Sequence, residues 1–153
     1  MRQEDAKLLA CLEQTIFSDN WSEQGIVETW QQKHSIILVA RENTEIRGYL
    51  IAYHVLDEVE IVRLAVLENA RGQGIGSELL TVLLETKHIC NILLEVREHN
   101  EVARTFYQQH GFVEVGLRKH FYQNPTEHAI LMKRELAQEI AKRSNKRSNK
   151  RSR

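Results

Sequence analysis

Apolar residues recur at helical spacing in two short segments near the N-terminus, so two amphipathic helices are predicted there. The first helix covers residues 5–17, with Asp5 as its N-cap, and the second follows Ser22, which can cap it in the same way. Their apolar faces consist of Leu8, Leu9, Leu12 and Ile16 in the first helix and Ile26, Val27 and Trp30 in the second.

A different pattern follows, in which short apolar runs are separated by polar turns. Three such runs cover residues 36–41, 46–55 and 59–66, and polar residues at 42–45 and 57–58 join them. Strands joined by turns this short pair with their neighbours in opposite directions. The first half of the chain therefore predicts an antiparallel meander of three strands.

The second half of the chain alternates helical and strand-like patterns. A helix is predicted up to Leu84, and Asn100 is placed to cap another helix that Gly111 can end. The strand-like runs are residues 92–96, 113–117 and 129–132. We therefore expect one α/β domain over residues 1–141, with a mixed, mostly antiparallel central sheet of six to seven strands and helices on both faces.

Charge divides the chain into an acidic body and a basic tail. The whole chain has 21 basic and 21 acidic residues, but residues 142–153 hold seven of the basic ones and no acid. Residues 1–141 therefore carry a net charge of −7, which favours a cationic partner through long-range attraction. The tail predicts a disordered extension, and its alternative role is a weak, nonspecific contact with RNA or the ribosome.

Several classes of protein are not favoured by the composition. No apolar run approaches the roughly 18 residues of a membrane span, and the polar N-terminus lacks a signal-peptide core. Two cysteines are typical of a protein whose thiols stay reduced, and the seven histidines show no metal-ligand spacing. We expect a cytoplasmic protein with no membrane contact and no metal.

The segment Arg71-Gly72-Gln73-Gly74-Ile75-Gly76 lies between a predicted strand and a predicted helix. Glycine lets a backbone approach a ligand closely, and the first amides of a helix point outward without internal partners. Together these features predict a cradle for a phosphate group. A glycine-rich turn that binds nothing is the simpler alternative.

Two well-known phosphate loops fit this segment poorly. The loop of nucleoside triphosphatases needs a lysine between its last glycine and Ser/Thr, whereas Ser77 follows Gly76 directly. The dinucleotide loop places its third glycine one residue later and opens a parallel βαβ unit, although Glu95 stands where a ribose-binding acid would. The preceding antiparallel meander argues against the dinucleotide loop.

The spacing Arg71-x-x-Gly74-x-Gly76 after a strand resembles the pyrophosphate loop of the GCN5-related N-acetyltransferase (GNAT) superfamily. The resemblance extends over about residues 5–135, and within the superfamily it is greatest to the RimI family of ribosomal-protein alanine N-acetyltransferases. The segments that carry it are Trp21-Ser22-Glu23, Leu64-Ala65-Val66, Leu94-Glu95-Val96-Arg97, Asn100, Ala103, Phe106-Tyr107, Gly111-Phe112, Arg118-Lys119-His120-Phe121-Tyr122 and Glu127-His128-Ala129-Ile130-Leu131-Met132.

The resemblance implies an acetyl-CoA-dependent enzyme whose acceptor is the N-terminal alanine of a small-subunit ribosomal protein. It also implies how acetyl-CoA is bound. Asn100 would hydrogen-bond the pantetheine arm, although it is equally a plain N-cap. The strand backbone would pair with the pantetheine amides, and the glycine loop would hold the pyrophosphate. The residues involved are Leu64, Ala65 and Val66 in the strand and Arg71, Gly72, Gln73, Gly74, Ile75 and Gly76 in the loop.

Glu95 and Tyr107 align with the general base and the general acid of the family. Glu95 lies in an apolar strand, where partial burial would raise its pKa. Tyr107 would keep its proton until a thiolate forms. The simpler alternatives are a solvated carboxylate or a partner of Arg97 for Glu95, and an ordinary core aromatic for Tyr107.

The chain departs from the family pattern at several positions, which concern the acceptor more than acetyl-CoA. Arg63 occupies a strand position that is often asparagine, Phe121 replaces a tyrosine, and His128 replaces an aspartate. The usual proline before the glycine loop is also absent. The alternatives therefore include another protein N-terminus, a lysine side chain or a small amine as acceptor. A non-catalytic module that binds coenzyme A or RNA is the alternative from another class.

Overall fold

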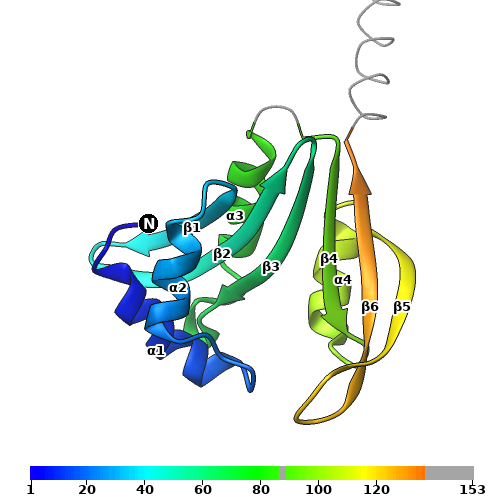
Figure 1. The fold of residues 1–153 in the computed structure, drawn as a ribbon, viewed down its shortest axis with the longest axis horizontal. Coiled ribbons are helices and arrows are strands. Elements are labelled where there is room, and N and C mark those ends of the chain that lie inside the picture. The colour runs from blue at the N-terminus through cyan, green and yellow to red at the C-terminus, as the bar shows by residue number, and fades with distance from the viewer. Residues whose placement is uncertain (87–88, 137–153) are drawn as a thin grey trace, which may run out of the picture.

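The computed structural model describes residues 1–86 and 89–136, and within them one six-stranded sheet carries helices on both faces (Figure 1). The elements in chain order are α1 (Asp5–Ile16), α2 (Glu23–Trp30), β1 (Ser35–Glu42), β2 (Glu45–Val55), β3 (Glu58–Val66), a 3-10 turn (Glu68–Ala70), α3 (Ile75–Leu84), β4 (Asn91–Arg97), α4 (Glu101–Gln109), β5 (Val113–Tyr122) and β6 (Glu127–Glu135). The basic tail predicted at residues 142–153 lies outside the described residues.

The strand order across the sheet is β1-β2-β3-β4-β6-β5. β1, β2 and β3 form the predicted antiparallel meander, and β3 and β4 are parallel. β6 then inserts antiparallel between β4 and β5. The predicted fold class is thus confirmed, with six strands, and the last two strands are longer than their apolar cores indicated.

Helix caps follow the sequence with one exception. The Ser22 hydroxyl accepts the Gly25 amide at 3.1 Å, and the Asn100 side chain accepts the Ala103 amide at 3.1 Å. Asp5, however, is not the N-cap of α1, because Glu4 stands there without a side-chain cap. The buried Asp5 carboxylate instead pairs with Arg41 and accepts the Arg2 amide at 2.6 Å, an ion pair that sequence spacing could not indicate.

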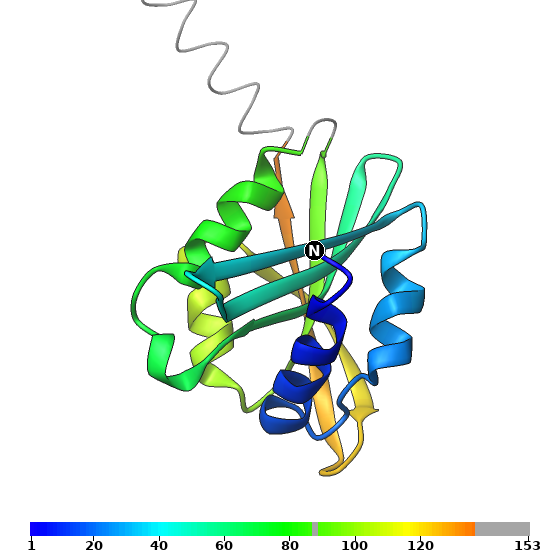
Figure 2. The ribbon, with the colours of Figure 1, turned by 90° about the vertical axis from the view of Figure 1, so that its left-hand side faces the viewer.

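Two hydrophobic cores lie on opposite faces of the sheet. α3 and α4 cover one face, and α1 and α2 cover the other (Figures 1 and 2). Among the described buried residues, the core under α1 and α2 takes its strand residues from β1, β2 and β3. Within residues 1–86 and 89–136, the adjoining face of β4, β6 and β5 is therefore left without a helix. No helix in the described part of the chain has the length and apolarity needed to cross a membrane.

β3 and β4 separate halfway along their length. They pair only between Glu58–Ile61 and Asn91–Leu94. At the end of that pairing β3 contains an extra residue, because Ile61 and Arg63 oppose adjacent residues of β2 and leave Val62 as a bulge. A bulge bends a strand and increases its local twist. Beyond Val62 the two strands diverge toward their C-terminal ends, as Figure 1 shows.

Candidate active site

The glycine loop lies beyond the C-terminal end of β3. Gly72 and Gly74 have φ angles of +74° and +81°, which suit glycine and strain other residues. Gly74 is the N-cap of α3, and its carbonyl accepts the first helical bond, from the Glu78 amide at 2.9 Å. The amides of the first turn of α3 precede that bond and have no acceptor within the helix. The anion site that the sequence predicts here stays a prediction, and the free first-turn amides support it.

Helices α3 and α4 pack closely beside this loop. A Cβ atom on Gly76 would lie 3.1 Å from the Phe106 ring, tighter than most such contacts. The Ser77 hydroxyl lies 2.9 Å from Nε2 of His110, which joins the start of α3 to the end of α4. Arg71 is exposed, and its Nε donates to the Val66 carbonyl at 3.3 Å. The loop is therefore held between β3 and α4.

Glu95 lies on the face of β4 that none of the described helices covers. Its neighbours Leu94 and Val96 point into the core under α3 and α4, whereas the Glu95 side chain is 17% exposed on the opposite face. Nη1 of Arg118, reaching across from β5, lies 3.0 Å from Oε1 of Glu95. The carboxylate is thus half-buried and paired with an exposed guanidinium.

The pKa of Glu95 is raised above its ordinary value. Partial burial is the main cause, since it disfavours the charged form, and the nearby Glu60 carboxylate raises the pKa further. The Arg118 guanidinium acts in the opposite direction. Glu60, Glu95 and Arg118 all line one cavity of about 290 Å³ between β3 and β5. Glu95 is therefore a more basic carboxylate than an exposed glutamate.

Tyr107 is buried on α4. Its ring makes edge-on contacts with Phe106 and Phe112, at centroid distances of 5.3 and 5.4 Å. Burial raises its pKa, with a smaller contribution from Tyr122. Tyr122, near the end of β5, has its pKa raised to about 12 by burial first and by the Glu95 carboxylate second. The two phenols and Glu95 therefore influence one another across the sheet.

Sequence reasoning missed several residues of this site. Arg118 and Tyr122 belong to segments that carry the family resemblance, but the sequence alone does not indicate a role for either. Glu60 gave no signal beyond its place on a strand. Glu95 does not pair with Arg97, as one interpretation had it, because Arg97 lies 3.4 Å from Glu127 and 4.4 Å from the centre of the Tyr122 ring. Asn100 does cap α4, as the simpler interpretation predicted.

The family is shown by comparison with known proteins. The family model described as Acetyltransferase (GNAT) family matches residues 7–112. The chain therefore belongs to the GNAT family, which makes it an acyltransferase whose acetyl donor is acetyl-CoA.

Individual relatives are named more specifically than the family as a whole. The chain is 36% identical over 134 residues to the ribosomal protein bS18-alanine N-acetyltransferase of Haemophilus influenzae, covering 84% of this chain and 90% of that protein. It is 30% identical over 136 residues to the enzyme of the same name from Haemophilus ducreyi, and this match covers 85% of this chain and 93% of that enzyme. The present structure superposes on the crystal structure of the Escherichia coli ribosomal-protein-S18-alanine N-acetyltransferase with a TM-score of 0.80 and 28% sequence identity. The match covers 88% of this chain and 90% of the E. coli chain. The expected resemblance to the RimI family is confirmed.

The opposing charges around Glu95 give a testable pH dependence. In a carboxyl-carbon NMR titration, Glu95 should titrate above the ordinary glutamate range. Arg118→Gln should move that pKa higher, because the ionised carboxylate loses its cation, and Glu60→Gln should move it lower, because a like charge is removed. Shifts of the same sign in both variants would contradict this arrangement.

Proposed function

We propose that this chain is an N-α-acetyltransferase that transfers the acetyl group of acetyl-CoA to the N-terminal alanine of a small-subunit ribosomal protein. The observation that carries the proposal is the half-buried, basic Glu95 on the open face of β4, one residue beyond the last β3–β4 pair. The names of its relatives support the acceptor, and the net charge of −7 over residues 1–141 suits a basic acceptor chain. With a ribosomal protein as the acceptor, we also propose that the enzyme acts in the cytoplasm.

The backbone of β3 offers a binding edge for the pantetheine arm. Beyond Ile61 this strand still pairs with β2 on one side, while its other edge faces the opening toward β4. The Leu67 amide donates to the Arg47 carbonyl at 2.9 Å, on the β2 side. Successive amides of a strand point in opposite directions, so the Val66 amide is directed toward the opening. Leu64, Ala65 and Val66 would thus receive the pantetheine as an added strand.

The diphosphate would bind at the glycine loop. The first-turn amides of α3 begin there and the exposed Arg71 belongs to the same loop, and a helix N-terminus favours negative charge. Gly72, Gln73, Gly74, Ile75 and Gly76 would supply the backbone donors of this grip. Asn100 would add a side-chain contact to the pantetheine arm from the start of α4.

Glu95 would act as the general base. Attack on the thioester needs a neutral amine, and an α-amine with a pKa of roughly 7.7–8.0 loses its proton near neutral pH far more easily than a lysine near 10.4. Glu95 would take that proton directly or through one water. Arg118, now paired with the carboxylate, would keep it ionised until the acceptor arrives.

The Val66 amide and Tyr107 would serve the two later stages. As the amine nitrogen bonds to the carbonyl carbon, the carbonyl oxygen becomes an oxyanion, which the Val66 N–H would stabilise. The carbon–sulfur bond then breaks, and the sulfur leaves with the bonding electrons. Because burial keeps the Tyr107 phenol protonated, it would donate its proton to the departing sulfur. The nitrogen, positively charged after attack, would release its surplus proton to water as the amide forms, and the phenolate would recover a proton from the same water.

The nearest alternatives differ in the acceptor. Transfer to another N-terminus, to a lysine side chain or to a small amine would use the same donor site. A non-catalytic module that binds coenzyme A or RNA would use the loop or the basic tail without Glu95 and Tyr107. A release assay for the coenzyme A thiol separates these functions.

The acceptor prediction is tested with a panel of peptides. Peptides that begin with Ala, Ser or Met, and an acetyl-Ala-Lys peptide with a blocked N-terminus, are each offered with acetyl-CoA. The alanine peptide should give the highest kcat/KM. Equal or faster thiol release with the blocked lysine peptide would replace this function by lysine acetylation. No release with any amine would favour the binding module.

The roles of Glu95 and Tyr107 are tested by two conservative substitutions. Glu95→Gln removes the base and Tyr107→Phe removes the proton donor, so each should lower turnover by about 10²- to 10⁴-fold. Acetyl-CoA affinity, measured by calorimetry, should stay close to that of the wild type, since neither side chain is assigned to its binding. Near-wild-type turnover in both variants would refute the assigned roles.

A further inference from the structure

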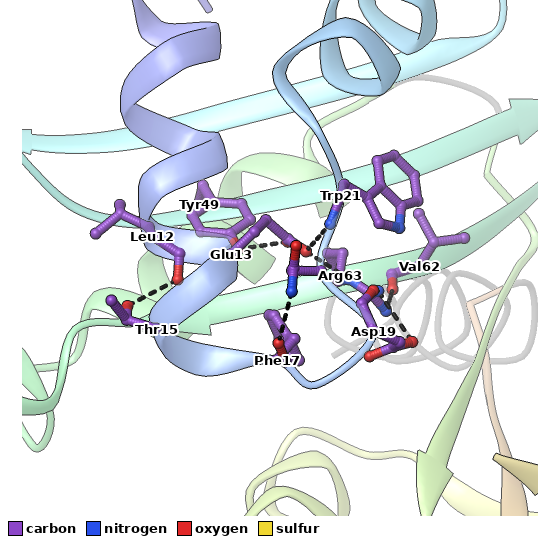
Figure 3. A network of polar contacts seen from close by, with 10 residues as sticks. Leu12, Glu13, Thr15, Phe17, Asp19, Trp21, Tyr49, Val62 and Arg63 are labelled. Atoms are coloured by element: carbon purple, nitrogen blue, oxygen red, sulfur yellow. Dashed lines mark hydrogen bonds and ion pairs between the residues drawn. The ribbon is translucent and has the colours of Figure 1, made fainter. Parts of the chain in front are cut away.

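Arg63 joins three parts of the chain beside the opening between β3 and β4 (Figure 3). Its Nε lies 3.4 Å from Oε2 of Glu13 on α1. Its Nη2 donates to the Asp19 carbonyl at 2.8 Å and lies 3.1 Å from the Asp19 carboxylate. One guanidinium on β3 thus holds both α1 and the α1–α2 connection, which we define as residues 17–22.

Two aromatic rings of the same connection complete the contact. The guanidinium carbon of Arg63 lies 4.6 Å from the centre of the Phe17 ring and 5.5 Å from that of Trp21. Such contacts are attractive because a cation favours the face of an aromatic ring. The Arg63 side chain is only 13% exposed, so these contacts are partly shielded from water. Arg63 therefore binds the connection at its beginning, middle and end.

Glu13 explains why a cation is needed at this place. Its carboxylate is fully buried, and it accepts the Tyr49 hydroxyl at 2.5 Å and the Trp21 amide at 3.0 Å. A buried carboxylate without a cation is strongly destabilising. The Arg63 Nε lies against Glu13, and the Nη2 is available to the connection.

The bulge in β3 directs Arg63 to this face. Ile61 and Leu64 contact the core under α3 and α4, whereas Val62 contacts the core under α1 and α2. Strict alternation from Ile61 would turn residue 63 toward α3. The extra residue, Val62, resets the alternation, and Arg63 therefore follows Val62 onto the face of α1. The feature that ends β3–β4 pairing also aims this side chain.

The α1–α2 connection stands beside the opening, next to the β5–β6 hairpin (Figures 1 and 2). The pKa of Tyr122, the last residue of β5, reflects charges on both the hairpin and the connection. After burial, its pKa responds to Glu95 and Arg97 and then to Asp19 and Arg63. The connection and the hairpin therefore flank the same opening from which Glu95 is reached. Half of the Asp19 side chain remains exposed there.

We propose that Arg63 is a positioning residue for the acceptor, because it fixes the α1–α2 connection as one wall of the acceptor's path and presents the exposed carboxylate of Asp19 to a cationic acceptor chain. The inference rests on the proposed acetyl transfer. An asparagine at this position would lack both the charge for Glu13 and the length to hold Asp19 as well.

Two single variants separate this role from general stability. Arg63→Lys keeps a cation for Glu13, but an ammonium group cannot also reach Asp19 and lie over two rings. Asp19→Ala removes the carboxylate that Arg63 contacts and the exposed negative charge, keeps the bond to the backbone carbonyl of this position, and leaves no buried charge. Each should raise KM for the acceptor peptide by about tenfold and leave KM for acetyl-CoA within about twofold. The double variant should be no worse than either single variant, because both act on one contact.

Arg104→Lys is the matched control. Arg104 also makes several bonds, at 2.7 and 3.1 Å to Glu114 and at 2.8 Å to the Glu98 carbonyl, but it lies on α4 away from the connection. Its substitution should change neither KM. Hydrogen exchange should become faster over residues 17–22 in Arg63→Lys and Asp19→Ala and stay unchanged in Arg104→Lys.

The outcomes distinguish this inference from the proposed function. No transfer to any amine by the wild-type chain would overturn both. Transfer by the wild type, with acceptor KM unchanged in folded Arg63→Lys and Asp19→Ala, would overturn the positioning role alone. A parallel rise of both KM values together with a lower melting temperature would also overturn it, because it would show a merely structural effect.

Discussion

The separation of β3 from β4 is the constraint on which the rest of the molecule depends. A single extra residue, Val62, ends the parallel pairing after Ile61 and bends β3 away from its neighbour. The divergence leaves one backbone edge of β3 unpaired with β4 and exposes the face of β4 that carries Glu95. It also brings the end of β3 to the glycine loop, where α3 begins. One local irregularity in the ladder thus arranges the donor and acceptor sides of the proposed site.

The charges around the opening are balanced in pairs rather than left free. Arg118 faces Glu95, and Arg63 is shared between the buried Glu13 and the exposed Asp19. Each guanidinium holds a carboxylate in place, while burial and Glu60 make Glu95 more basic. The acidic surplus of residues 1–141 suits the cationic acceptor chain that we propose. Structure and electrostatics therefore favour the same kind of acceptor.

The order of elements was accessible from sequence because apolar periodicity and the caps at Ser22 and Asn100 are local signals. The glycine loop was accessible for the same reason, since positive φ at Gly72 and Gly74 requires that residue type. The insertion of β6 between β4 and β5 and the bulge at Val62 depend on register between distant strands. The pairing of Glu95 with Arg118, which are 23 positions apart, depends on the same register. Asp5 shows the same limit, because a tertiary ion pair with Arg41 overrode its local propensity as a cap.

The most direct test is a crystal structure with a bisubstrate analogue, in which coenzyme A is joined through its acetyl group to the N-terminus of an alanine peptide. The pantetheine should lie between β3 and β4 and pair with Leu64 and Val66, with the diphosphate at residues 71–76. The alanine nitrogen should lie within about 3 Å of Glu95 or be linked to it by one water. An analogue bound away from the opening, or an alanine nitrogen on the α3 side of the sheet, would contradict the idea that the diverging strands form the site of transfer.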